Sequence, residues 1–293
     1  MSTNHRRSLL GLAAAGVSLL AAHTFAHNSW VVSNITRMAG PGAVRLAFVT
    51  GHDEFPSGEV ATQSGRIASW DVHLSGSVTP VAGYAIEGAE LVAQHELTEP
   101  GLHIAAAALH PRFIELAGEK FTSYLWDEGA IEVLRARRES GAESEPGLEY
   151  YTKFGKTFVQ VGPIDAADTS YADPIGHRLE IIPLSNPASW GVGDTVRVRV
   201  LSEGEPIAEL PIASGHESSK AHDYEQSVFT DADGIAEFTI DKPGHWFIRT
   251  HTIGPAVDGL PAIGLTQPGH ELEDPRLADW DSYWASITVE VGE

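Results

Sequence analysis

Short apolar runs, each broken by Gly, Pro, Asn or Asp, recur along almost the whole chain after residue 27. In AVRLAFVT (43–50), Val44, Leu46 and Phe48 alternate with their neighbours and fall on one face of an extended strand. Runs with the same pattern lie at 66–74, 101–109, 156–162, 179–184, 194–201, 235–240, 245–252 and 286–291. Many short strands separated by turn signals are typical of β-sandwiches, so we predict an all-β fold.

One segment departs from the strand pattern. Apolar residues recur at near-helical spacing near 118–138, which predicts one short helix. A stretch containing Gly and Pro at 162–176 has the composition of a linker. We therefore place a boundary at 165–175 and expect two Ig-like β-sandwich domains, at 27–165 and 175–293, with the helix inserted in the first.

Residues 1–26 have the layout of a secretory signal peptide. Arg6 and Arg7 precede an apolar run of roughly 14 residues, and the small residue Ala26 closes the segment. The arginine pair followed by Ser-Leu-Leu is similar to a twin-arginine signal, with the general secretory route as the alternative. The run is too short for a comfortable membrane span, and no later segment is long and apolar enough. We expect cleavage after Ala26, export to the periplasm, and a mature protein that does not span a membrane.

Composition excludes several classes of function. The chain has 293 residues with 19 basic and 40 acidic side chains, a formal net charge of -21. Nucleic acid is not an expected partner, because phosphate contacts need clustered Lys and Arg. With no Cys and only 2 Met, a metal site must use nitrogen and oxygen ligands. The sequence has no G-x-S-x-G, phosphate-binding Gly loop or H-E-x-x-H motif, so we do not expect an enzyme.

The stretch FAHNSW (25–30) contains the first candidate ligand. After cleavage behind Ala26, His27 carries a free α-amine beside its imidazole. The amine has a usual pKa of about 7.7–8.0 and the imidazole one of about 6.5, so both can be neutral near pH 7.5. Both can then chelate one metal ion. The alternative is a solvated ring at the start of a strand.

Two more histidines lie at the ends of predicted strands. His52 follows the strand at 43–50 and has two acidic neighbours, and His251 lies near the end of the strand at 245–252. Loops at strand ends are frequent places for binding sites. Imidazole and amine donors suit nickel, cobalt, copper or zinc, so we expect a divalent transition metal at His27, His52 and His251. A polar turn and a packed ring are the alternatives.

The remaining histidines of the mature chain are weaker candidates. His216, His222 and His270 lie in loops with acidic residues and are expected to be solvated. His103 and His110 are expected to pack against a strand or cap it.

Several motifs point to a known family. In chain order they are His27 and Trp30, Gly51-His52, FTSYLWDEGA (121–130), YYTKFGKTFVQVG (150–162), TDADGIAEF, PGHWFIRTH and DWDSYWASITVEV (279–291). With this order and spacing the chain resembles the DUF4198 family, exported β-rich proteins linked with nickel or cobalt uptake. The resemblance implies a periplasmic protein that hands a transition metal to an uptake component of the cell envelope. It also implies a mature N-terminus that serves as a ligand.

Two other functions stay open. The chain could be a cell-envelope interaction module that presents loops to a partner without any metal. It could also be a copper oxygenase with a histidine brace, which needs a second histidine facing His27. Convergence of His27, His52 and His251 in the folded chain would favour the metal site.

Overall fold

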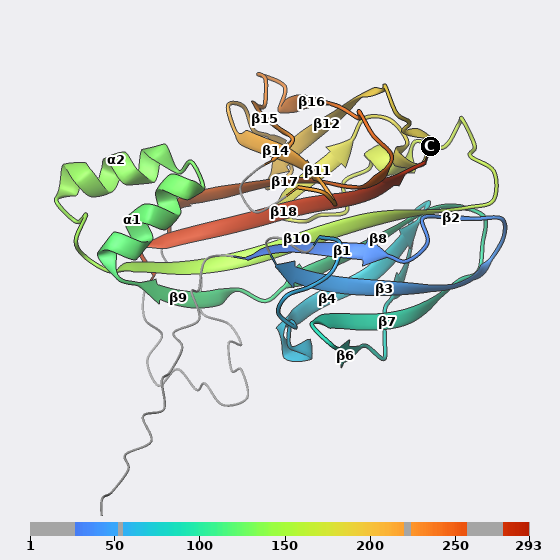
Figure 1. Cartoon of the computed structure of the whole chain (residues 1–293), viewed down its shortest axis with the longest axis horizontal. Coiled ribbons are helices and arrows are strands. Elements are labelled where there is room, and N and C mark those ends of the chain that lie inside the picture. Colours follow the sequence, from blue (N-terminus) through green and yellow to red (C-terminus); the bar gives the residue numbers. More distant parts are fainter. Residues whose placement is uncertain (1–26, 52–54, 220–223, 257–277, 293) are drawn as a thin grey trace, which may run out of the picture.

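The computed structural model describes residues 27–51, 55–219, 224–256 and 278–292. Most of its regular structure is β-strand, arranged in three sheets, which confirms the predicted all-β fold. Figure 1 shows two layered units, one above and one below a pair of long strands that cross the whole molecule.

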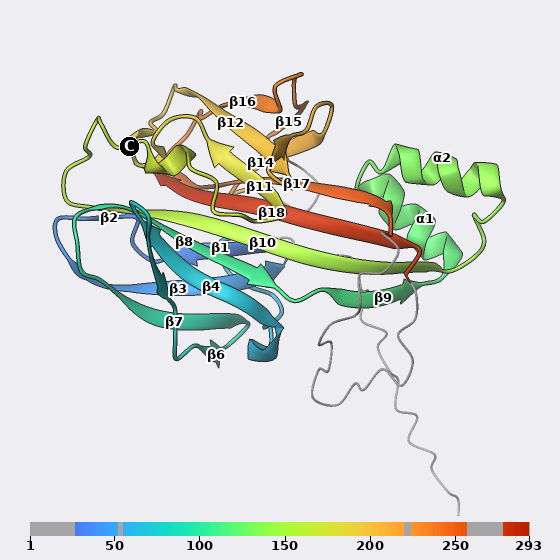
Figure 2. The same ribbon diagram turned by 180° about the vertical axis from the view of Figure 1, so that it is seen from behind.

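The largest sheet has ten strands and forms the middle of the molecule (Figures 1 and 2). Its strands are β2 (Arg37–Met38), β4 (Ile67–Leu74), β5 (Ser77–Pro80), β8 (Gly101–Leu109), β9 (Arg112–Leu116), β10 (Gly147–Val161), β14 (Pro211–His216), β15 (Gln226–Phe229), β17 (Gly244–Pro255) and β18 (Trp280–Val291). The order is β15-β14-β17-β18-β10-β8-β4-β5, and β2 and β9 also pair with β10. Strands β10 and β18 pair in parallel at its centre.

Two smaller sheets cover the large one. The first has the order β1-β3-β7-β6, and the second contains β11-β12-β13 with β16 paired to β12. The first consists of β1 (Asn28–Ser33), β3 (Gly42–Gly51), β6 (Ala85–Glu87) and β7 (Glu90–Leu97). The second consists of β11 (Leu179–Pro183), β12 (Thr195–Ser202), β13 (Glu205–Pro206) and β16 (Ile235–Thr239). Short 3-10 turns lie at Ser64–Arg66, Ser170–Ala172 and Pro187–Ser189.

Each small sheet packs on the large sheet to form a β-sandwich with its own apolar core. In the lower sandwich of Figure 1, Leu46, Phe48 and Trp70 belong to one buried cluster. In the upper sandwich, Phe238 and Trp246 belong to another. The large sheet takes strands from both sides of the boundary expected at 165–175, and the division into domains stays a prediction.

Two helices lie at one end of the molecule (Figure 1): α1 (Gly118–Asp127) and α2 (Ile131–Ser140). The single helix expected near 118–138 is divided because Gly129 has a φ of +70°, a left-handed conformation that ends α1. The buried face of α1 presents Phe121 and Leu125 to a cluster that includes Trp284 of β18. Neither these helices nor any other described helix has the length and apolar composition needed to cross a membrane.

The central strands have two chemically different faces. Because side chains alternate along a strand, Phe154 and Phe158 of β10 point to one side and reach the core of the upper sandwich with Ile287 of β18. Lys153 and the Cα of Gly155 face the other side, toward β1 and the residue before it. The next subsection describes that second face.

One buried ion pair interrupts the apolar face. Lys156 of β10 donates to Glu180 of β11 at 2.9 Å, and both side chains are almost completely buried. Glu180 also accepts hydrogen bonds from the main-chain N–H groups of Ile175, Gly176 and His177. These bonds compensate the carboxylate for the water it has lost, and the ion pair with Lys156 joins β11 to the central sheet.

Removing one partner of this pair should destabilise the fold strongly. We expect Lys156→Met to lower the free energy of unfolding by about 3–5 kcal/mol, because it leaves the Glu180 carboxylate buried without its counter-charge. The measurement is urea unfolding at pH 7. Arg197→Met is the matched control, since Arg197 pairs with Glu237 on the surface and such pairs contribute about 0–1 kcal/mol. Equal losses in the two variants would contradict the assignment.

Candidate functional site

One face of the adjacent strands β10, β18 and β17 carries buried polar side chains. The pairing register places Lys153 beside Trp284 and Trp284 beside His251, so these three side chains leave the sheet on the same side. The same alternation adds further residues to this surface. We call it the polar face and define it by Glu149, Lys153, Arg249, His251, Ser282, Trp284 and Ser286, all of which are buried.

The end of α1 supplies a carboxylate to the polar face. Glu128, the residue at the C-cap of α1, is buried and accepts a hydrogen bond from Arg249 Nη2 at 2.9 Å. Arg249 Nη1 donates to the hydroxyl of Tyr224 at 2.6 Å, and the guanidinium lies 5.0 Å from the ring centroid of Trp284. Burial lowers the pKa of Arg249, but the charges of Glu128 and Tyr224 and the hydrogen bonds to both side chains together outweigh burial, so the pKa is raised. The two buried charges therefore compensate each other.

His251 is enclosed between an aromatic ring and this carboxylate. Its ring stacks on that of Trp284 with the centroids 4.7 Å apart, and its Nδ1 lies 3.7 Å from Glu128 Oε2. Burial lowers the pKa of His251 to about 4, although the nearby carboxylate acts in the opposite direction. The imidazole is neutral at neutral pH, which is the form that a metal ligand must have.

Glu149 lies at the α1 end of the same face. Its Oε1 accepts hydrogen bonds from Tyr124 Oη, at 3.1 Å, and from Ser282 Oγ. The indole Nε1 of Trp284 donates to Ser282 Oγ at 3.1 Å and extends this chain of bonds. Burial raises the pKa of Glu149 to about 7 even though both hydrogen bonds favour the carboxylate. This side chain therefore changes its charge near neutral pH.

Lys153 joins the polar face to the beginning of the described chain. Its ammonium donates to the main-chain carbonyl of His27 and lies 5.6 Å from the ring centroid of Trp284. Burial, followed by the positive charges of Arg66 and Arg249, lowers the pKa of Lys153 to about 7. A substantial fraction of this side chain is thus uncharged at pH 7–8.

A small cavity lies where β1 meets the polar face. Its volume of about 10 Å³ is enough for roughly one water molecule. Lys153, Arg249, Trp284 and Trp30 contribute to its lining. Trp30 Nε1 and Arg249 Nε are buried and have no hydrogen-bond partner within the described part of the chain.

Two of the three predicted ligands lie close to this cluster. His251 belongs to the polar face, and His27 reaches it through its main-chain carbonyl. Lys153 and His251 both contact the ring of Trp284, so a short chain of contacts links the two histidines.

The third predicted ligand, His52, lies outside the described residues. Gly51, the residue directly before it, pairs with Asn28, the residue directly after His27. Among residues 27–51, 55–219, 224–256 and 278–292, no three or more His, Asp or Glu side chains form a group that could hold a metal ion. The predicted set includes His52 and so extends beyond these ranges.

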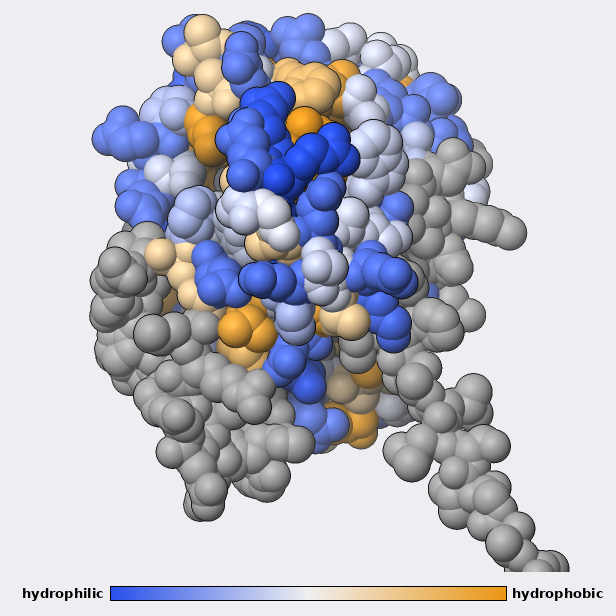
Figure 3. Space-filling view, turned by 90° about the vertical axis from the view of Figure 1, so that its left-hand side faces the viewer, coloured by the Kyte–Doolittle hydropathy of each residue, from blue (hydrophilic) through white to orange (hydrophobic). Residues whose placement is uncertain are grey.

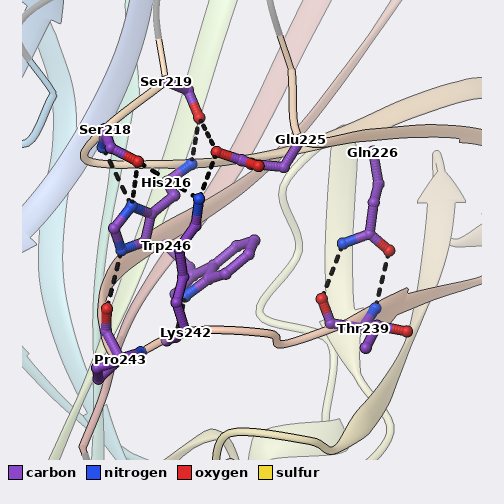
Figure 4. A network of polar contacts seen from close by, with 9 residues as sticks. All are labelled: His216, Ser218, Ser219, Glu225, Gln226, Thr239, Lys242, Pro243 and Trp246. Carbon is purple, nitrogen blue, oxygen red and sulfur yellow. Dashed lines mark hydrogen bonds and ion pairs between the residues drawn. The ribbon is translucent and has the colours of Figure 1, made fainter.

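The expectation that His216 is solvated is wrong. Its ring is buried, and its nitrogens interact with Ser218 Oγ at 2.8 Å and with the carbonyl of Pro243 at 3.0 Å (Figure 4). The ring also packs edge-on against Trp246 at 5.2 Å. Because both ring nitrogens are occupied, this histidine fastens the end of β14 to the start of β17. An ion pair at 2.9 Å between Lys242 and Glu225 closes the outer side of the network.

For the other histidines with a stated expectation, the structure tests His103 but not His222 or His270. His103 is buried and its Nε2 meets the carbonyl of Glu99 at 2.9 Å, so the expectation that it packs against its strand is confirmed. His222 and His270 lie outside the described residues.

The charged residues of this site are absent from the sequence-based predictions. Glu149 and Lys153 precede the predicted strand at 156–162, and Glu128 lies inside the predicted helix. The one available signal is a charged residue between aromatic ones, as in YYTKF around Lys153. This pattern indicates a buried charge only when the strand is already known to extend through Lys153.

The fold and site define an all-β protein of two sandwiches that share a central sheet with one polar face. The family described as a domain of unknown function, DUF4198, matches residues 24–254, and the chain belongs to that family. A search of the curated proteins finds no match.

Solved structures give only distant similarities. Native α-2-macroglobulin from Escherichia coli, spanning domains MG0-NIE-MG1, is 10% identical with a TM-score of 0.20, covering 74% of this chain and 91% of that one. The D0-D1 domain of intimin is 12% identical with a TM-score of 0.20, covering 89% and 99%. BcpA, the major pilin subunit of Bacillus cereus, is 12% identical with a TM-score of 0.17, covering 91% and 66%.

The raised pKa of Glu149 predicts a specific dependence of stability on pH. Between about pH 4.5 and pH 7 the folded protein keeps a proton on Glu149 that the unfolded chain has lost, so this group stabilises the fold less as the pH rises. Glu149→Gln cannot ionise and retains an acceptor oxygen. Relative to wild type, its free energy of unfolding should increase by up to about 3 kcal/mol between pH 4.5 and pH 7.5.

Urea unfolding at the two pH values measures this difference. Thr230→Val, a buried substitution between two neutral side chains, is the control and should differ from wild type equally at both pH values. A Glu149→Gln difference that is also the same at both would show that Glu149 is already ionised in the folded protein.

Proposed function

We propose that the exported protein binds a divalent transition metal ion as cargo and supports nickel- or cobalt-type uptake from the periplasm. The α-amine and imidazole of His27, freed by cleavage after Ala26, would bind the ion together with the imidazole of His52. The observation that carries the proposal is the pairing of Asn28 with Gly51, since these residues adjoin the two histidines in the sequence.

The chemistry of the donors supports this proposal. An amine and an imidazole on one residue are already joined, so the second bond costs little additional ordering entropy. Nitrogen donors suit nickel, cobalt, copper and zinc, and intrinsic affinity is greatest for copper. A set of only a few protein ligands leaves positions open for a receiving component, which suits a carrier better than a structural site.

The charges around His27 set the conditions for binding. Lys153 and Arg249 would repel a cation, but Glu128 compensates Arg249 and the lowered pKa of Lys153 leaves much of it neutral at pH 7–8. His251 supplies a further neutral imidazole on the same face, and we propose it as the third donor. Its enclosure between Trp284 and Glu128 means that this last role requires the ring to move.

The proposal predicts that the α-amine and imidazole of His27 determine the affinity for metal. Mature protein beginning at His27 is titrated calorimetrically with Ni²⁺, Co²⁺, Cu²⁺ and Zn²⁺ at pH 6 and pH 8. We expect tighter binding at pH 8, because the amine and imidazole lose their protons across this range. His27→Ala and His52→Ala should each weaken binding at least about tenfold, which corresponds to 1.4 kcal/mol.

Three comparison proteins test whether the effect is specific to His27 and its α-amine. His95→Ala, on β7 of the lower sandwich, should bind like wild type, which shows that not every histidine contributes. Mature protein acetylated at its α-amine, and precursor that retains residues 1–26, should both bind more weakly than the free form. If wild type and His27→Ala bind with the same affinity, the proposal is wrong.

A surface at the helical end favours the alternative function, an envelope interaction module. Trp126 of α1 is 70% exposed and Ile131 of α2 is 46% exposed. Both line a cleft of about 230 Å³ between the helices, with Leu134 beside them and Arg135 and Arg138 also in the lining. Figure 3 shows this end of the molecule, where hydrophobic patches adjoin strongly hydrophilic ones. Exposed apolar surface of this kind often binds another protein. This alternative would take precedence if mature protein bound none of the four metals.

A further inference from the structure

Strand β1 lies at the edge of its sheet, with β3 as its one strand neighbour there. In an antiparallel pair, every second residue of an edge strand turns its carbonyl away from its neighbour. In β1 and the residue before it, these are the carbonyls of His27, Ser29 and Val31. A buried carbonyl must find another donor, so the partners of these three groups show what holds the strand.

Side chains of the central strands supply all three donors. Lys153 Nζ donates to the carbonyl of His27, and Ser286 Oγ donates to that of Ser29 at 2.7 Å. Thr288 Oγ1 donates to the carbonyl of Val31 at 2.6 Å. The three carbonyls follow one another at intervals of two residues, and each accepts a hydrogen bond from a different side chain of β10 or β18. We call Lys153, Ser286 and Thr288 the β1 clamp.

The backbone of β10 is adapted to this contact. Gly155 has no side chain, and a Cβ there would lie 3.0 Å from Val31 Cγ2 and 3.1 Å from Val31 N. The absence of that atom lets β1 approach the central sheet closely enough for the hydroxyls to reach its carbonyls.

We infer that Lys153 is the positioning residue of the amino terminus: it fixes the main chain of His27 at the polar face and so holds the proposed metal-binding residue in place. The inference rests on the proposed function for its effect on metal, and on the β1 clamp alone for its effect on the chain. A metal ligand held in advance does not lose its freedom on binding, which increases affinity.

The position of Lys153 within the clamp supports this role. The first residues of a domain are usually poorly ordered unless something fastens them. Ser286 and Thr288 hold β1 further along, whereas Lys153 holds the residue just before it. Its side chain is buried and contacts the ring of Trp284, so the ammonium has few other positions.

Amide exchange of metal-free mature protein tests the effect on the chain. Lys153→Met has a similar length but no donor, and it should speed the exchange of the main-chain amides of residues 28–30 at least tenfold. Lys153→Arg keeps a donor and should restore most of the protection. Thr230→Val, which removes a side-chain bond to the carbonyl of Ile207 in the upper sandwich, controls for loss of stability and should leave these amides unchanged.

Metal affinity tests the positioning role. With Cu²⁺ or Ni²⁺ as the probe, Lys153→Met should bind at least tenfold more weakly, and Thr230→Val should bind like wild type. Unchanged exchange in Lys153→Met would overturn the inference whether or not metal binds. Faster exchange without loss of affinity would also overturn the positioning role.

Metal binding by wild type and amide exchange in Lys153→Met test the two proposals separately. If wild type binds no metal but Lys153→Met shows faster exchange at residues 28–30, the proposed function is wrong and the hold on the N-terminus stands. If Lys153→Met does not fold, Gly155→Ala provides the second variant. It should push Val31 outward, leave the donors in place and speed the same amides.

Discussion

The parallel pairing of β10 with β18 is the constraint on which the rest of the structure depends. Parallel strands are normally covered on both faces, and here different elements of the structure cover the two faces. The apolar face enters the upper core and tolerates one charge, Lys156, because Glu180 meets it there. The other face is covered by β1 and α1 and contains most of the polar chemistry. The two sandwiches share the central sheet, since β10 contributes Phe154 and Phe158 to the upper core and Val159 and Val161 to the lower one.

The polar face limits buried charge by several means at once. Arg249 is paired with Glu128, and His251 stays neutral because its pKa is low. Glu149 and Lys153 have pKa values near 7, shifted toward each other from opposite ends of the scale. Each shift has the same cause, since burial penalises whichever form carries charge. The result is a buried surface whose net charge changes within the physiological range of pH.

Apolar alternation predicted several of the strands that bury side chains in a core, and the predicted boundaries agree closely with β3, β4, β8, β11, β12 and β16. The prediction missed β1, β7 and β14, although Val31, Leu91 and Ile212 on these strands also belong to a core. The predicted strands corresponding to β10 and β18 are too short, because Glu149, Lys153 and Asp281 interrupt the apolar pattern where those strands continue. The polar face depends on a register between residues more than 100 positions apart, which local periodicity does not contain. Of the candidate ligands, His251 had a signal in its strand, whereas nothing local indicated that Lys153 would contact His27.

The β1 clamp has a consequence for the order in which the chain is completed. Two of its donors, Ser286 and Thr288, lie 257 positions after the carbonyls they hold, close to the end of the sequence. The first strand therefore cannot dock until the last strand has been synthesised and paired. Long-range contacts of this kind form slowly. His27 and β1 thus reach their place only after Ser286 and Thr288 of β18 have been synthesised.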